Sequence, residues 1–215
     1  MTPMAKGRSA RVQPRRSREN WLEAALEVLS RQGAARIRVR DLCADLGVTT
    51  GSFYAHFAGR DDFIRSVAKY WQRRYTTEIV ERIRHEPGDP RSRLVALTEG
   101  IIQQDLTRYD VAVRAWAAQE SAVAAVVRQV DKERLGILRE LFFELGFRGA
   151  ELEMTTRTFV TYYSLEQSIL VRQSKRDRMR EARSRIEMLL LPLSGRSSDA
   201  ARPAAGQRST APPGS

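Results

Sequence analysis

The residues most often used for catalysis are scarce in this sequence. The chain has two histidines, His56 and His85, and one cysteine, Cys43. A Ser/His/Asp triad, a Cys/His pair or a zinc site needs several such residues at a defined spacing, and no such set can be recognised. We therefore expect no enzymatic activity, no catalytic residues, no metal site and no cofactor.

Basic side chains dominate the charge of the chain. Of its 215 residues, 37 are Lys or Arg and 26 are Asp or Glu, which gives a formal net charge of +11. This excess favours a polyanionic partner, either nucleic acid or an anionic membrane surface. No apolar run approaches the roughly 18 to 20 residues of a membrane-spanning helix, and the N-terminus lacks the apolar core of a signal peptide. With one cysteine and no such segments, we expect a reduced, cytoplasmic protein.

The hydrophobic spacing predicts an all-α chain of about nine helices, with no convincing strand. Ser17, Asp89 and Asp110 are the expected N-caps of three of these helices. The helices are expected at residues 17–33, 39–46, 49–56, 60–84, 90–106, around 113–116, 121–145, 150–173 and 177–191.

Composition divides the chain into segments. Residues 1–16 are basic and contain no acid, and residues 194–215 are rich in Ser, Ala, Pro and Gly, so we expect both ends to be disordered. A Pro/Gly cluster at 85–90 is the best internal boundary. The expected order is a small domain at 17–63, a connecting helix at 60–85, and a second domain at 89–193.

The segment DLCADLGVTTGSFYAHF, residues 41–57, has the residue types of a helix-turn-helix. Leu42, Leu46 and Phe53 supply apolar contacts between two short helices, and Gly47 allows the backbone to reverse between them. An ordinary αα-hairpin would show the same spacing without touching DNA. The spacing alone therefore leaves both interpretations open.

The sequence also matches a longer signature, which reads I-A-x-x-x-G-V-s-x-G-x-x-Y-x-H-F-x-x-K-x-x-L. The matching residues are Leu42, Cys43, Gly47, Val48, Gly51, Tyr54, His56, Phe57, Arg60 and Phe63. With this signature the sequence resembles the DNA-binding domain of TetR/AcrR-family transcriptional regulators. Arg38 replaces the usual Ser or Thr cap, Cys43 the common Ala, and Arg60 the common Lys. The resemblance covers residues 17–193 at the level of fold. It implies an N-terminal three-helix helix-turn-helix domain followed by a helical ligand-binding and dimerisation domain.

The resemblance implies that the helix after Gly47 enters the major groove of DNA. Tyr54 and His56 match positions that contact phosphate, and Arg60 resembles the family's phosphate-binding lysine. Arg40 could reach a guanine edge or, equally, a phosphate. The full set of expected DNA-contacting residues is Arg38, Arg40, Thr49, Thr50, Gly51, Ser52, Tyr54, His56 and Arg60.

The resemblance also implies a ligand cavity among the helices of the second domain. Candidate wall residues combine aromatic rings with a few amides and hydroxyls: Gln104, Val113, Trp116, Gln119, Phe159, Tyr162 and Tyr163. These residues could equally be plain core, which is the commoner role of aromatic stripes at helical spacing. No acidic residue or histidine clearly interrupts the apolar stripes, which argues against a metal or cationic effector.

The resemblance places a homodimer interface on the last two helices. Apolar ridges that a single small domain would leave uncovered are expected there: Phe159, Leu165, Ile169, Ile186, Leu189 and Leu190. Together these features imply a sequence-specific transcriptional regulator. We expect a repressor that binds a palindromic operator in double-stranded DNA and is released by a small apolar or aromatic ligand.

Two other functions remain open at this point. The basic arm alone could support a non-specific or architectural DNA-binding protein without ligand response, whose affinity would fall steeply with salt and show no preference among sequences. The second alternative is an enzyme with an appended DNA-binding domain, which turnover of a substrate would reveal.

Overall fold

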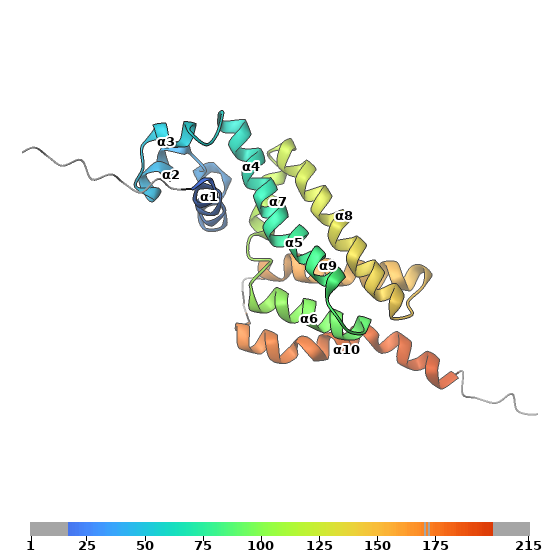
Figure 1. Ribbon diagram of the computed structural model, residues 1–215. Helices are drawn as coiled ribbons and strands as arrows, with labels where there is room; N and C mark the ends of the chain where they lie inside the picture. The colour runs from blue at the N-terminus through green and yellow to red at the C-terminus, as the bar shows by residue number, and fades with distance from the viewer. Residues whose placement is uncertain (1–16, 170, 172, 200–215) are drawn as a thin grey trace, which may run out of the picture.

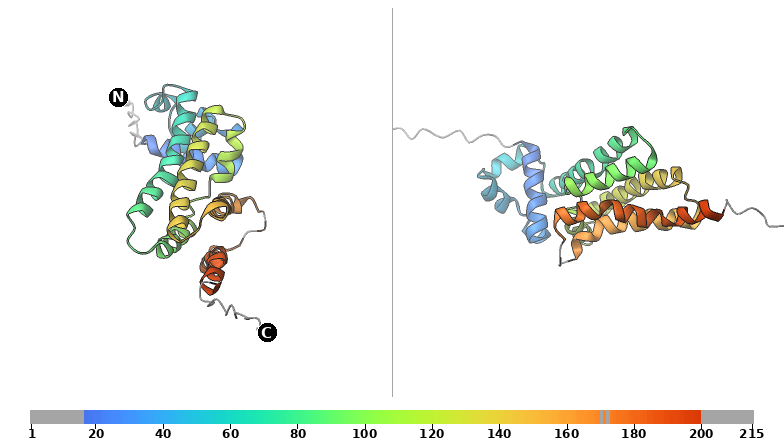
Figure 2. Two further views of the ribbon diagram at one scale, coloured as in Figure 1. Left: turned by 90° about the vertical axis from the view of Figure 1, so that its right-hand side faces the viewer. Right: turned by 90° about the horizontal axis from the view of Figure 1, so that it is seen from below.

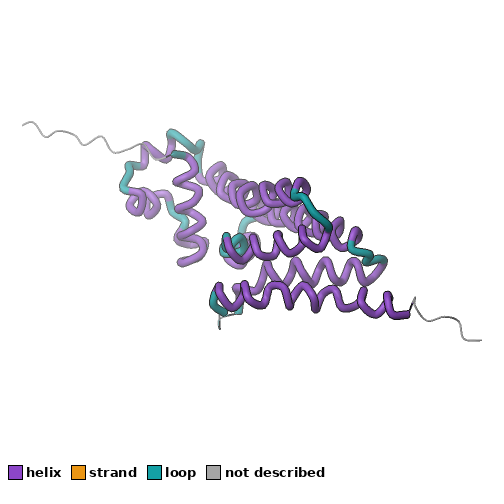
Figure 3. Tube along the Cα trace, turned by 60° about the horizontal axis from the view of Figure 1, so that its bottom comes forward, coloured by secondary structure: helices purple, strands orange, loops and turns teal. Residues whose placement is uncertain are grey.

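The computed structural model describes residues 17–169, 171 and 173–199, and for 192–199 the backbone only. Helices and connecting loops make up the described chain, and no strand occurs in it (Figure 3). The α-helices are α1 (Arg18–Gln32), α2 (Val39–Leu46), α3 (Thr50–Tyr54), α4 (Arg60–Gln72), α5 (Glu78–His85), α6 (Pro90–Gln103), α7 (Asp110–Ala117), α8 (Ser121–Glu144), α9 (Gly149–Leu165) and α10 (Lys175–Asp199). None of the described helices is long and apolar enough to span a bilayer.

Two of the expected helix caps are present. The Ser17 hydroxyl accepts a hydrogen bond from the Asn20 backbone N–H, and the Asn20 side chain accepts one from the Ser17 backbone N–H. Asp89 accepts hydrogen bonds from the backbone N–H groups of Arg91 and Ser92. The third expected cap, Asp110, is instead the first residue inside α7, and its side chain is fully buried.

The long helix expected over 60–84 contains an irregularity. A π-helical turn, η2 (Arg73–Thr77), joins α4 to α5, so the helix continues to His85 with one widened turn. If α4, η2 and α5 are counted as one helix, the described chain has the nine helices that the sequence predicts. A π turn inside an α-helix often occurs at a functional position.

The end of the chain differs in detail from the expected boundaries. Helix α9 ends at Leu165 and is followed by a 3₁₀ turn, η3 (Glu166–Ser168), whereas a helix to residue 173 was expected. Helix α10 begins at Lys175 and reaches Asp199, so it extends into the segment expected to be unstructured. The basic arm at 1–16 and the last part of the tail, 200–215, lie outside the described residues.

The buried apolar residues form two clusters. The first joins α1–α4 to α7 and to the first half of α8, with Trp21, Phe53 and Trp71 among its largest members. The second joins α5, α6, the second half of α8, α9 and α10. The cores therefore meet along α8 and the α4–α5 helix, and Tyr75, in the π turn, packs against both of them.

The helices are arranged so that a small helical unit projects from a larger bundle. In Figure 1, α1–α3 lie to one side, α4–α5 and α8 run side by side away from them, and α6 and α10 lie below α4–α5. The view from below in Figure 2 shows the same separation of the α1–α3 unit from the bundle. Helix α1 contacts the bundle through α4 and α7, and α4 in turn packs against α8.

Candidate nucleic-acid interface and internal cavity

The turn between α2 and α3 has the geometry of a helix-turn-helix. Gly47 adopts a left-handed conformation with φ 66°, which glycine tolerates without strain. The N–H of Val48 then donates to the Cys43 carbonyl at 3.0 Å, which closes the turn. Phe53 is fully buried and packs edge-on against Trp21 and Phe63, with ring centroids 5.6 and 5.2 Å away. These contacts fix one face of α3 and leave the other face exposed.

The residues expected to contact DNA lie on and around that free face. Seven of the nine are exposed, and none is buried. Tyr54 is 63% exposed although it adjoins the buried Phe53, so its ring is available to a partner. Ser52 and His56 are half-buried. The structure thus brings the expected set together on the small unit.

Arg60 has an acidic partner from a distant part of the chain. Its Nη2 donates to Oε1 of Glu120 at 2.5 Å, and its Nη1 lies 3.7 Å from Oδ1 of Asp61. Glu120 directly precedes α8, so this ion pair joins the first residue of α4 to the start of α8. The Arg60 side chain is still 65% exposed.

A partly buried polar network holds α1 against the π turn. The Glu23 carboxylate on α1 accepts hydrogen bonds from the hydroxyls of Tyr70 and Tyr75, at 2.6 and 3.2 Å, and from Arg108 at 3.1 Å. Burial and the neighbouring Glu23 carboxylate raise the pKa of Tyr75, so its hydroxyl stays protonated and donates. Tyr75 therefore connects the helix-turn-helix unit to the bundle.

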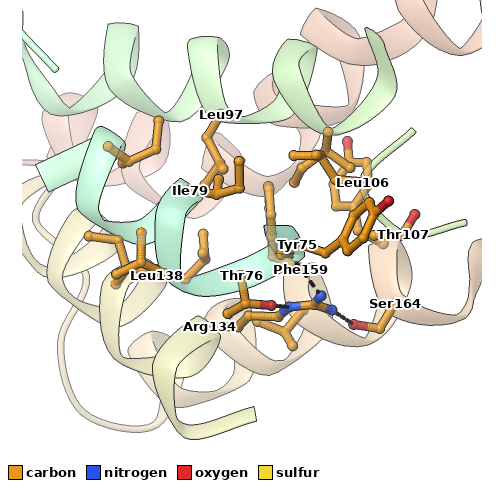
Figure 4. Close-up of a pocket in the computed structure, with 16 residues that line it drawn as sticks. Tyr75, Thr76, Ile79, Leu97, Leu106, Thr107, Arg134, Leu138, Phe159 and Ser164 are labelled. Carbon is orange, nitrogen blue, oxygen red and sulfur yellow. Dashed lines mark hydrogen bonds between the residues drawn. The ribbon is translucent and has the colours of Figure 1, made fainter. Parts of the chain in front are cut away.

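An apolar cavity of about 60 Å³ lies inside the bundle, between α5, α6, α8 and α9 (Figure 4). Most of its lining side chains are aliphatic or aromatic, and the polar ones are Thr76, Thr107, Arg134 and Ser164. The lining residues are Tyr75, Thr76, Ile79, Val80, Ile83, Leu97, Ile101, Leu106, Thr107, Arg134, Ile137, Leu138, Phe159, Val160, Tyr163 and Ser164.

Arg134 is the charged residue among these lining residues, and its charge is balanced. Its guanidinium forms a bidentate ion pair with the fully buried carboxylate of Asp110 on α7. It also donates to the hydroxyls of Thr76 and Ser164, at 3.0 and 3.1 Å, and to the Tyr75 carbonyl at 3.4 Å (Figure 4). One side chain therefore joins α7, α8, α9 and the π turn. The buried Asp110 also corrects the expectation that no acid enters the apolar stripes.

The structure separates the residues expected to line the ligand cavity. Phe159 and Tyr163 line it. Val113 and Trp116 do not, because α7 packs its apolar face against α1 and the first half of α8, and Trp116 is 3% exposed in the first core. The candidates that lie exposed on the surface are Gln104, Gln119 and Tyr162.

The sequence interpretation missed Tyr75, Thr76 and Arg134 as wall residues. The one available signal of a buried charge was Asp110, which stands at the start of the apolar run in α7. Arg134 itself lies among charged neighbours, in DKERLG, and nothing in that pattern marks it as buried.

The last two helices carry exposed apolar residues, but other ones than expected. Ile186 and Leu190 are buried, because α10 turns the stripe that contains Ala182 against α6, and Phe159 is buried in the same core. Leu165 and Ile169 are exposed as expected, and Leu189 is partly buried. The exposed apolar residues of α9 and α10 are Met154, Tyr162, Leu165, Met188 and Leu191. We refer to these five as the α9–α10 face.

Comparison with known proteins identifies the fold. Residues 22–67 match the family model of bacterial regulatory proteins, tetR family. A putative transcriptional regulator from Pseudomonas aeruginosa PAO1 is 21% identical with a TM-score of 0.64, over 89% of this chain and 97% of its own. A putative TetR-family regulator from Rhodococcus sp. is 18% identical with a TM-score of 0.65, over 83% and 100% of the two chains.

A third similar structure, a putative regulator from Saccharomonospora viridis in complex with choline, is 16% identical with a TM-score of 0.65, over 79% of this chain and 95% of its own. A search of curated proteins finds no match. Residues 22–67 therefore resemble the N-terminal domain of the tetR family, and the chain has the fold of solved TetR-family transcriptional regulators. The family resemblance and the all-α fold class are confirmed.

Proposed function

We propose that this chain is a homodimeric transcriptional regulator, acting in the cytoplasm as a repressor, and that it carries out no enzymatic reaction. One α3 helix of each protomer would enter the major groove at one half of a palindromic operator. The observation that carries this proposal is the exposed face of α3 and its flanks, held in place by the buried Phe53. A fixed helix with small polar residues at its start is suited to base edges and phosphates.

The ligand-responsive part of the proposal rests on the cavity. Its volume is well below the roughly 300 Å³ of a pocket for a drug-sized molecule, so a larger ligand would have to displace the walls. Tyr75 is both a wall residue and a hydrogen-bond donor to α1, so its displacement would alter how the helix-turn-helix unit is held. A ligand that fits the displaced state better than the DNA-binding state would then release the operator.

The cavity chemistry favours a small apolar or aromatic ligand without a positive charge. The described lining residues offer no free carboxylate, because Asp110 is paired with Arg134 and lies behind it. A cation would meet a guanidinium instead. The neighbour from Saccharomonospora viridis binds choline, and we propose that this chain does not.

Two substitutions test the proposed DNA interface, because one should change only the affinity for DNA and the other the sequence preference. Tyr54→Phe should weaken binding several-fold for every sequence, since a phosphate contact is sequence-independent, whereas Thr50→Ala should change which bases are preferred. Quantitative binding to a panel of operator variants measures both effects. If Tyr54→Phe changed the base preference, the phosphate assignment would be wrong.

A further inference from the structure

The ion pair between Arg60 and Glu120 lies at the edge of the proposed DNA interface. Arg60 begins α4 directly after the helix-turn-helix, and Glu120 reaches it from the turn between α7 and α8. In Figure 1 the first turns of α4 and α8 lie at the same end of the bundle, the end nearest α3. The Arg60 donor group Nη2 is therefore already bound to a carboxylate where a phosphate would have to bind.

We propose that Glu120 is an intramolecular competitor of the DNA phosphate for Arg60. This inference rests on the proposed function and adds a form of regulation to the same interface. A carboxylate and a phosphate offer the guanidinium similar anionic oxygen acceptors, so the two exclude each other at one donor edge. Binding DNA then requires Arg60 either to leave Glu120 or to use its remaining N–H groups beside a repelling negative charge.

The position of Glu120 connects this competition to the cavity. Glu120 directly precedes α8, the helix that carries Arg134, Ile137 and Leu138 into the cavity wall. A helix moves largely as a rigid element, so a displacement of α8 at the cavity also displaces the carboxylate at its start. The ion pair thus links a movement of α8 at the proposed ligand site to the proposed DNA contact at Arg60.

The variant that tests the proposal is Glu120→Gln, which keeps the size of the side chain and removes its charge. Glu120 makes no side-chain capping bond to α8, so the helix should be retained. Exposed ion pairs are weak, so we expect DNA affinity to rise about two- to fivefold per subunit. The salt dependence of binding should also steepen by up to about one unit per subunit, because Arg60 then neutralises a phosphate fully.

Two controls separate competition from a general change in charge. Asp61→Asn removes an equal charge 3.7 Å from Arg60 on an 80% exposed side chain, and should have a smaller effect. In an Arg60→Gln background, Glu120→Gln should give no more gain than Asp61→Asn gives there. Binding is measured by titration of a short duplex of mixed sequence and of the selected operator, at several salt concentrations.

The outcomes distinguish this proposal from the proposed function. Unchanged affinity in Glu120→Gln, or an equal gain with and without Arg60, would overturn the competition while operator selectivity persists. An absence of sequence selectivity in the wild type would overturn the proposed function, and the effect of Glu120→Gln on the mixed-sequence duplex could still be measured. A gain that depends on Arg60 supports the competition in either case.

Discussion

Asp110→Asn should lower the free energy of unfolding by about 3 to 5 kcal/mol, because it leaves the buried guanidinium of Arg134 without a counter-charge. Asp110 is fully buried and Arg134 is nearly so, so water can replace little of the lost interaction. For a chain of this size, the loss corresponds to a fall in the melting temperature of roughly 6 to 20 °C. Thermal unfolding followed by circular dichroism, at a fixed protein concentration, measures it.

Asp131→Asn is the matched control for this prediction. Asp131 on α8 pairs with Arg114 on α7, so it also bridges these two helices, but both side chains are partly exposed. Its loss should cost about 1 kcal/mol or less after solvent screening. If Asp110→Asn lowered the free energy of unfolding by no more than Asp131→Asn does, the Asp110–Arg134 ion pair would not stabilise the fold as described here.

Met188→Asp should convert the proposed dimer into monomers and weaken operator binding by at least about 100-fold. Met188 is 63% exposed and lies in the α9–α10 face, where a charge buried against a second copy would have no partner. A monomer binds one half-site at a time and loses the gain from linking two sites, which is of the order of 10²- to 10⁴-fold. Sedimentation velocity at micromolar concentration and operator titration measure the two effects.

Phe143→Asp is the control for the dimer prediction. Phe143 is an exposed aromatic residue on α8, outside the α9–α10 face, and it stacks on Arg148 within the same chain. The Phe143→Asp variant should remain dimeric and bind the operator normally. A wild-type protein that sediments as a monomer, or a Met188→Asp variant that stays dimeric, would contradict the proposed interface.

The helix-turn-helix could be predicted from the sequence because local residues determine it. Gly47 permits the turn, and the Val48 N–H closes it with a hydrogen bond to Cys43. Phe53 lies a few residues further along the chain and is buried. The caps at Ser17 and Asp89 are local in the same way. Such features need only a few neighbouring residues, so their pattern is complete within a short segment.

The cavity could not be predicted in the same way because its walls depend on tertiary packing. Whether Trp116 faces a cavity or a core depends on what α7 packs against, and its apolar face packs against α1 and the first half of α8. Asp110 and Arg134 are 24 residues apart; Asp110 has the position of an N-cap, and Arg134 resembles an ordinary surface charge in its own segment. The π turn that brings Tyr75 between the two cores also lacks a sequence signal that we recognise.

Selection of bound duplexes from a random DNA pool by the purified full-length protein tests the central claim most directly. The account predicts enrichment of one inverted repeat, with its two half-sites spaced to suit a symmetric dimer, and loss of that enrichment when Thr50 is replaced by Ala. Retention of DNA at low salt without any enriched sequence would contradict it. That result would favour the architectural alternative, in which the positive charge of the chain binds DNA without reading it.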